Sequence, residues 1–179
     1  MSISTRIALL RGINITGNRT LPMADLRSLC EEIGLVDPVT YIASGNVIFG
    51  SDDPAAEIEN AIHAAINAAF GYDVKVMVRT PSKFEEILQG NPYADRDPKS
   101  LAVTLLADDA DPERLEPILD GEYGNDEFAV TGDVVYLHLP DGYGRTKLHN
   151  NFFESKLKTS ATTRNWRTMN KLAEVARNR

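Results

Sequence analysis

The sequence predicts an α+β protein that contains an internal duplication of two ferredoxin-like units, each ordered β-α-β-β-α-β with an extra helix appended. Three observations support this fold class. Strand-like and helix-like segments follow one another in this order twice along the chain. The hairpin segment at residues 44–49 (SGNVIF) matches residues 131–136 (TGDVVY) at every position, by identity or by chemistry. A repeated order of elements around a repeated turn is typical of a duplicated unit.

The first half supplies one complete unit. An apolar run predicts a buried strand that Gly12 ends, and apolar residues at helical spacing predict a helix that Gly34 caps. A hairpin, a second helix, an alternating strand and a short helix follow. The corresponding segments are 6–13, 22–34, 39–50, 54–70, 73–80 and 82–88.

The second half repeats the pattern. A strand and a short helix precede a hairpin that turns at Gly132 and Asp133, and a helix, a last strand and a final helix follow. The segments are 101–107, 112–119, 127–139, 146–157, 160–165 and 166–177. We expect two antiparallel sheets with helices packed on one face of each, and two domains at 1–92 and 93–179 that share one globule.

The charge of the chain is unevenly distributed. Its net charge is −7, but residues 145–179 alone carry +7 while residues 1–144 carry −14. A basic segment on an acidic protein either pairs with the acidic part or binds an anion.

The composition indicates a cytoplasmic protein. The chain has 179 residues, of which 42% are hydrophobic, and no apolar run is long enough to span a bilayer. The first residues make a poor signal peptide, because their short apolar stretch runs directly into Arg11. The single cysteine, Cys30, cannot form an internal disulfide and is expected to be buried.

The first loop is not a nucleotide-binding P-loop. Gly12 and Gly17 have the spacing of that motif, but Asn18 and Arg19 stand where it requires a lysine and then a hydroxyl residue. The lysine that contacts the phosphates and the hydroxyl that holds magnesium are therefore both missing.

Three motifs in order carry a family resemblance. The segments LLRGINITGNRTLPMADLRSL, TYIASGNVIF and SKLKTSATTRNWRTMNKLAEVA resemble the bacterial family catalogued as domain of unknown function 1697. The resemblance covers nearly the whole chain. It implies a duplicated α+β fold with ferredoxin-related halves, and it implies no activity, cofactor or substrate.

Two groups of residues are candidates for ligand binding. In the first unit, the loop after the first strand and the hairpin turn fall at the same end of the sheet, where short polar groups stand beside glycines. The candidates there are Arg11, Asn14, Asn18, Ser44 and Asn46. The alternative is that the asparagines only shape turns.

The second group lies in the basic C-terminal segment, where cations and amides suit an anion. The candidates are Arg145, Lys147, Thr163, Arg164 and Asn165. Thr162 and Thr163 are expected to cap the final helix. Arg164 is expected to pair either with an acidic side chain or with a ligand anion.

The leading functional hypothesis is a binding module for a small anionic ligand, of the phosphate or nucleotide kind. A nucleic-acid-binding protein and an enzyme of unidentified class are the alternatives. RNA-binding sheets of this fold stack bases on aromatic residues of central strands, and the first strand here has none. The histidines are scattered without metal-ligand spacing, and no catalytic motif is present, so no catalytic residue, metal or cofactor is assigned.

Overall fold

The structure, a computed structural model, describes residues 3–179. It divides into two compact units: unit 1, Met1–Glu85 with Lys171–Arg179, and unit 2, Glu86–Asn170. The predicted division of the sequence into domains at 1–92 and 93–179 stays a prediction.

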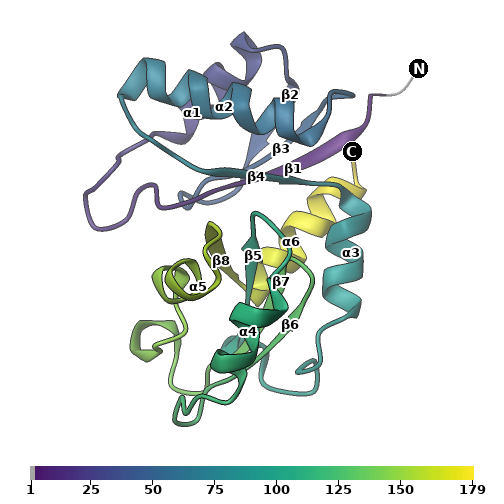
Figure 1. Ribbon diagram of the computed structural model, residues 1–179. Coiled ribbons are helices and arrows are strands. Elements are labelled where there is room, and N and C mark those ends of the chain that lie inside the picture. Colours follow the sequence, from purple (N-terminus) through teal and green to yellow (C-terminus); the bar gives the residue numbers. More distant parts are fainter. Residues whose placement is uncertain (1–2) are drawn as a thin grey trace. The chain divides into compact units, whose positions relative to one another are not determined.

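Unit 1 contains a four-stranded antiparallel sheet with the strand order β2-β3-β1-β4 (Figure 1). This is the strand order that β-α-β-β-α-β connectivity gives when both helices cross the same face. The elements are β1 (Thr5–Leu10), α1 (Met23–Glu32), β2 (Val36–Thr40), β3 (Asn46–Gly50), α2 (Ala55–Phe70) and β4 (Val76–Arg79).

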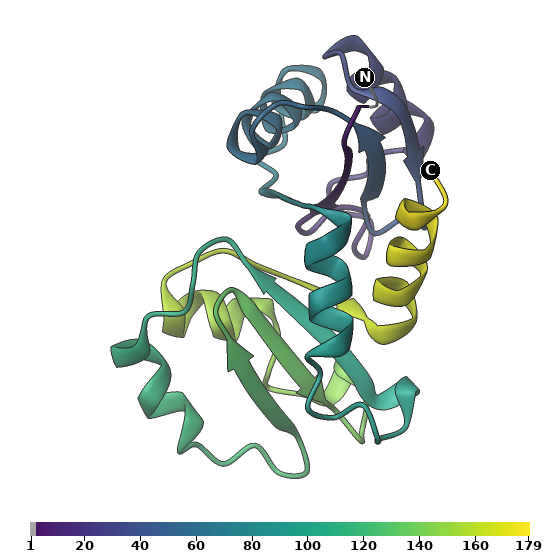
Figure 2. The ribbon, with the colours of Figure 1, turned by 90° about the vertical axis from the view of Figure 1, so that its right-hand side faces the viewer.

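Unit 2 repeats this topology with the strand order β6-β7-β5-β8. Figure 2, turned by 90° from Figure 1, shows the strands of this sheet from another side. Its elements are β5 (Leu101–Leu106), α4 (Pro112–Leu119), β6 (Glu127–Thr131), β7 (Val134–His138), α5 (Asn150–Leu157) and β8 (Ala161–Asn165). The predicted duplicated α+β fold is therefore confirmed.

Two α-helices and two short 3₁₀ turns complete the described chain. Helices α3 (Pro81–Gln89) and α6 (Trp166–Arg177) are the extra helices that follow each β-α-β-β-α-β unit, as predicted. The 3₁₀ turns are η1 (Pro98–Ser100) and η2 (Tyr143–Arg145).

One face of each sheet is covered by the two helices of its own unit. In unit 1, the side chains of Leu10 and Phe49 pack in one cluster with Leu26 of α1 and Ile62 of α2. Figure 1 shows α1 and α2 together on one side of this sheet. In unit 2, the corresponding cluster joins strand residues to α4 and α5, and its members include Leu106, Val135, Leu137, Ile118, Phe153 and Leu157.

The two hairpins differ in their turns. The β6–β7 turn consists of Gly132 and Asp133, as predicted. The expected tight turn at Gly45 and Asn46 is wrong, because β2 ends at Thr40 and Asn46 already belongs to β3. The connection from β2 to β3 is longer than a two-residue turn because Ile42 and Gly45 both adopt positive φ, of 50° and 84°.

Two helix starts also differ from the sequence prediction. Helix α5 begins at Asn150 rather than near residue 146, because His149 caps it by accepting a hydrogen bond from the backbone N–H of Phe152. Helix α6 is capped by Asn165, whose Oδ1 accepts from the N–H of Thr168 at 2.8 Å. Thr162 and Thr163, which we expected to cap it, lie within β8.

The side chain of Arg179 binds the irregular part of the β2–β3 pair. The register of this pair shifts between Val36 and Val39. The Arg179 guanidinium donates to the carbonyls of Asp37 and Ile48 at 2.7 and 2.8 Å, and to that of Val36 at 3.2 Å. Arg179 therefore supplies donors where the ladder is irregular.

Candidate functional site

Asn14 holds the loop after β1 together. Its amide group donates to the carbonyls of Leu21 and Ala43, and its Oδ1 accepts from the N–H of Leu21 at 2.7 Å. The contact with Ala43 confirms that this loop meets the β2–β3 loop. Asn18 is exposed and closes a turn through its backbone N–H and the carbonyl of Ile15.

The other candidates of unit 1 also have structural contacts. Asn46 is fully buried and donates to the carbonyl of Tyr41 at 2.8 Å and to the hydroxyl of Ser44 at 2.9 Å. The backbone N–H of Arg11 donates to the carbonyl of Lys75 at 2.9 Å. A role of these residues in ligand binding stays a prediction.

The candidates in β8 point in different directions, because successive side chains of a strand alternate between its faces. The Thr163 hydroxyl donates to Asn150 Oδ1 at 2.7 Å and lies 2.7 Å from the hydroxyl of Thr104. Asn165, at the end of the strand, caps α6. These contacts connect β8 to β5 and to two helices.

Arg164 is a buried cation within β8. Its guanidinium donates to the Thr162 hydroxyl at 2.8 Å and to the carbonyl of Thr163 at 2.9 Å. Burial lowers the pKa of Arg164 from 12.5 to about 10, so the side chain is still protonated at neutral pH.

The structure brings two predicted residues together. Arg145 and Lys147 line one open cavity in unit 2, with a volume of about 450 Å³. Within residues 3–179, neither the Arg145 guanidinium nor the Lys147 ammonium group forms a hydrogen bond or an ion pair. The other lining residues are Tyr123, Gly124, Asn125, Asp126 and Asp141.

Strand geometry explains why these loops meet. Strand β6 begins at Glu127 and its antiparallel neighbour β7 ends at His138, and the two residues are paired. The loop before β6 and the loop after β7 are therefore at the same end of the sheet. The two loops supply all the lining residues of the cavity.

Both loops are anchored beside the cavity. The Tyr123 hydroxyl donates to the carbonyl of Ile118 at 2.7 Å, and its ring packs edge-on against Phe128 and Phe152. On the other side, the buried Leu148 follows Lys147 directly, and its N–H donates to the Thr146 hydroxyl at 2.9 Å. The two cations are thus carried on a short anchored segment.

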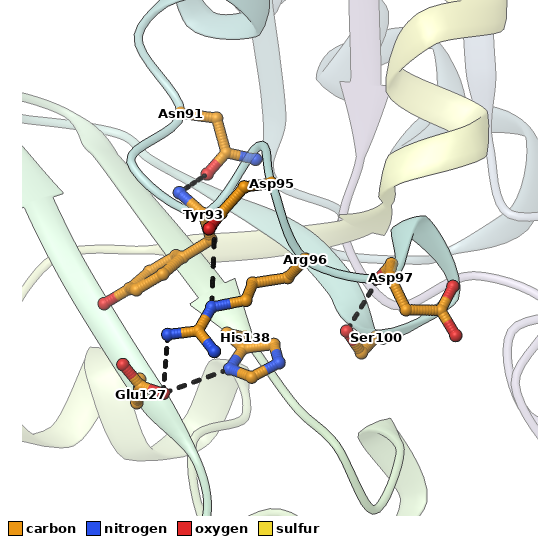
Figure 3. Close-up of polar contacts among 8 residues, drawn as sticks. All are labelled: Asn91, Tyr93, Asp95, Arg96, Asp97, Ser100, Glu127 and His138. Carbon is orange, nitrogen blue, oxygen red and sulfur yellow. Dashed lines mark hydrogen bonds and ion pairs between the residues drawn. The ribbon is translucent and has the colours of Figure 1, made fainter.

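A second polar cluster lies at the same end of the sheet (Figure 3). Glu127 Oε1 is 3.2 Å from His138 Nδ1 and 3.9 Å from Arg96 Nη2. The ring of Tyr93 lies 5.9 Å from that of His138, and burial, reinforced by Glu127, raises the pKa of Tyr93. A histidine held by a carboxylate suits proton transfer. These residues do not line the unit 2 cavity, and their contacts tie the segment after α3 to the sheet.

Unit 1 has a smaller cavity of about 210 Å³ with three cations, Arg6, Arg79 and Lys83, in its lining. Arg79 Nη1 lies 3.7 Å from Glu59 Oε1, and both side chains are mostly buried. The positive charge of Arg79 is therefore partly compensated, in contrast to those of Arg145 and Lys147.

No group of three histidine, cysteine or acidic residues within residues 3–179 is placed to hold a metal ion. No helix in that part of the chain has the length and apolar character needed to cross a membrane.

The fold and the cavity define the class of protein: a duplicated ferredoxin-like α+β protein with an open polar cavity at one end of its second sheet. The chain belongs to the family described as protein of unknown function (DUF1697), whose model matches residues 3–136. The resemblance found in the sequence is thereby confirmed.

A solved structure with the same fold is that of the conserved bacterial protein SP0830 from Streptococcus pneumoniae. It is 20% identical to this chain, and the alignment covers 98% of this chain and 99% of that one with a TM-score of 0.79. At this level of identity the likeness shows the fold alone. A search among curated proteins gave no match.

Sequence reasoning missed five of the seven lining residues, among them Asp126 and Asp141. Two signals were available: the turn dipeptides Gly124-Asn125 and Asp141-Gly142 lie within a few residues of the start of β6 and the end of β7. Because the hairpin strands are antiparallel, the segments before and after the hairpin had to meet.

Proposed function

We propose that this protein binds a small anionic ligand, of the phosphate or nucleotide-like kind, in the unit 2 cavity. One observation carries the proposal. Arg145 and Lys147 line the same cavity, and within residues 3–179 neither side-chain cation forms a hydrogen bond or an ion pair. Arginine binds phosphate oxygens through two parallel N–H donors, and lysine adds a point charge.

The size of the cavity fits this class of ligand. Its volume of about 450 Å³ lies within the range of small-molecule sites, which is roughly 300–1,000 Å³. Gly124, which lines the cavity, adopts a positive φ of 66°. A glycine lets backbone N–H groups approach an anion closely.

The nucleic-acid alternative has less support. Binding of single-stranded RNA on a sheet of this type relies on aromatic rings that are exposed on the central strands. Phe49, the aromatic residue of β3, is fully buried and packs in the core of unit 1.

For the cellular compartment, we propose the cytoplasm. The support is the single cysteine, Cys30, which is buried and has no disulfide partner. Disulfide-free proteins are usual where thiols are kept reduced.

Thermal unfolding in the presence of ligands tests the function. The panel contains inorganic phosphate, sugar phosphates and nucleoside monophosphates. A ligand at 100 times its dissociation constant stabilises the folded protein by about 2.7 kcal/mol. We expect Arg145→Met and Lys147→Met each to reduce that stabilisation strongly, and the double variant to abolish it.

The control is Lys156→Met. Lys156 is an exposed cation of the same basic segment and does not line the cavity. It should respond to ligands like the wild type. A double variant that keeps the full ligand response, or a broad panel without any response, would contradict the proposal.

A further inference from the structure

The unit 2 cavity contains carboxylates as well as cations. Asp126 and Asp141 line it together with Arg145 and Lys147. Among residues 3–179, no ion pair joins either carboxylate to either cation, although Asp141 Oδ2 is 3.4 Å from Asn125 Nδ2. The charged groups of the cavity therefore do not neutralise one another by direct contact.

A simple anion pairs with the two cations of the cavity but offers few hydrogen-bond donors to its two carboxylates. Inorganic phosphate can accept hydrogen bonds from the two cations, but its own P–OH groups are its only donors to the carboxylates, and its net negative charge is repelled by Asp126. An ionised carboxylate is only an acceptor, so it needs a donor on the ligand. The cavity is also much larger than one phosphate ion requires.

We infer that the ligand is a phosphate monoester that carries hydroxyl groups, as in a sugar phosphate or the ribose phosphate part of a nucleotide. This inference rests on the proposed function and specifies its ligand class. The phosphate group is held by Arg145 and Lys147, and hydroxyl groups donate to Asp126 and Asp141. Asn125 has both a donor and an acceptor, which suits hydroxyl groups because they also have both.

The test is the binding of three probes by calorimetry: inorganic phosphate, ribose 5-phosphate and phosphoethanolamine. We expect the wild type to bind ribose 5-phosphate at least about tenfold more tightly than inorganic phosphate, because hydrogen bonds to a charged acceptor are added. Phosphoethanolamine carries an ammonium donor in place of hydroxyl groups. Tighter binding of phosphoethanolamine than of ribose 5-phosphate would overturn the inference.

Asp126→Asn gives the sharpest result, because the two probes should respond in opposite directions. It should weaken ribose 5-phosphate binding about tenfold, since a charged acceptor is lost, and it should tighten inorganic phosphate binding, since a repulsive charge is removed. Asp120→Asn is the matched control, because Asp120 is an exposed aspartate of unit 2 that does not line the cavity.

The variants distinguish a failure of the proposed function from a failure of the inferred ligand class. If Arg145→Met and Lys147→Met leave the binding of all probes unchanged, the proposed function and this inference are both wrong. If those variants lose phosphate binding but Asp126→Asn leaves ribose 5-phosphate binding unchanged, only the inference is wrong.

Discussion

The side-chain amide of Asn14 donates to the backbone carbonyl of Ala43 at 2.7 Å, and this bond joins the loop after β1 to the β2–β3 loop. The same side chain closes its own loop through Leu21. Asn14 has a φ of 54°, in the region that asparagine tolerates better than most residues.

Asn14→Ala should therefore lower the free energy of unfolding by about 4 kcal/mol. The substitution removes three hydrogen bonds, each worth about 1 kcal/mol net, and places alanine at positive φ. Chemical denaturation measures the change. Asn18→Ala, in the exposed part of the same loop, should change stability by less than about 0.5 kcal/mol. Equal effects of the two substitutions would refute this account of the loop.

Gly45→Ala should be much more destabilising than Gly17→Ala. Both glycines have positive φ, but a Cβ at Gly45 would lie 2.7 Å from Ile13 Cδ1 and 2.8 Å from Leu10 Cβ, whereas a Cβ at Gly17 meets nothing within 4 Å. We expect Gly17→Ala to cost about 1 kcal/mol through backbone strain alone. Gly45→Ala adds overpacking of roughly 1–3 kcal/mol. Thermal unfolding of the two variants compares them directly.

Arg179→Ala should destabilise unit 1 although the residue is exposed. Its guanidinium donates to three backbone carbonyls of β2 and β3. Losing these bonds should cost about 1 kcal/mol at an exposed site and should increase amide hydrogen exchange in β2. Arg167→Ala, at another exposed arginine of the C-terminal segment, is the control. Unchanged exchange in β2 would show that the chain end does not support this strand.

Cys30 should be unreactive in the folded protein. Burial, reinforced by Glu31, raises the pKa of its thiol from 9.0 to about 12. An aromatic disulfide reagent at pH 8 should therefore label Cys30 only after unfolding. Rapid labelling of the native protein would contradict its buried position.

The same shift makes stability depend on pH in the alkaline range. The folded-state pKa is above the unfolded value, so the contribution of the neutral thiol is fully present below pH 9. It is lost as the pH rises from 9 towards about 12, because the unfolded thiol ionises first. The slope from this group is at most about 1.4 kcal/mol per pH unit. Cys30→Ala should remove that part of the slope, which urea denaturation at a series of pH values can measure.

Arg164→Ala should lower stability and leave ligand binding intact. The residue is 7% exposed and its guanidinium donates to Thr162 and Thr163, so removal of the side chain leaves a cavity and unsatisfied acceptors. We expect a cost of about 2–4 kcal/mol. The stabilisation by a phosphate ester should match that of the wild type. If that stabilisation disappeared while the melting temperature stayed the same, Arg164 would be a ligand-binding residue.

The order of the elements could be predicted because each carries a local signal. Periodic apolar residues, the glycine after α1 and the Gly132–Asp133 turn all act over a few residues. Even the short strand β8 could be placed, because the repeated topology required a strand there. Two errors occurred where a single side chain decides a helix boundary, as at the caps His149 and Asn165, and a third where positive φ at Ile42 and Gly45 sets the β2–β3 connection.

The candidate site was only partly predictable. Charge patterning identified the basic segment that contains Arg145 and Lys147, but it could not separate these from Arg164, whose side chain is buried. That distinction depends on the tertiary structure: Arg145 and Lys147 lie in the loop after β7, whereas Arg164 lies at a buried position of β8. Asp126 and Asp141 carry no signal as isolated acidic residues. They become informative only when the hairpin brings their loops together.

The most direct test of the proposed binding function is a titration of the isotope-labelled protein with ribose 5-phosphate, followed by NMR of the backbone amides. We predict saturable shifts concentrated at residues 123–126 and 141–147, including the amides of Gly124 and Gly142, and no such shifts in the Arg145→Met, Lys147→Met double variant. Saturable shifts confined to other parts of the chain, or identical shifts in the wild type and the double variant, would contradict the binding site described here.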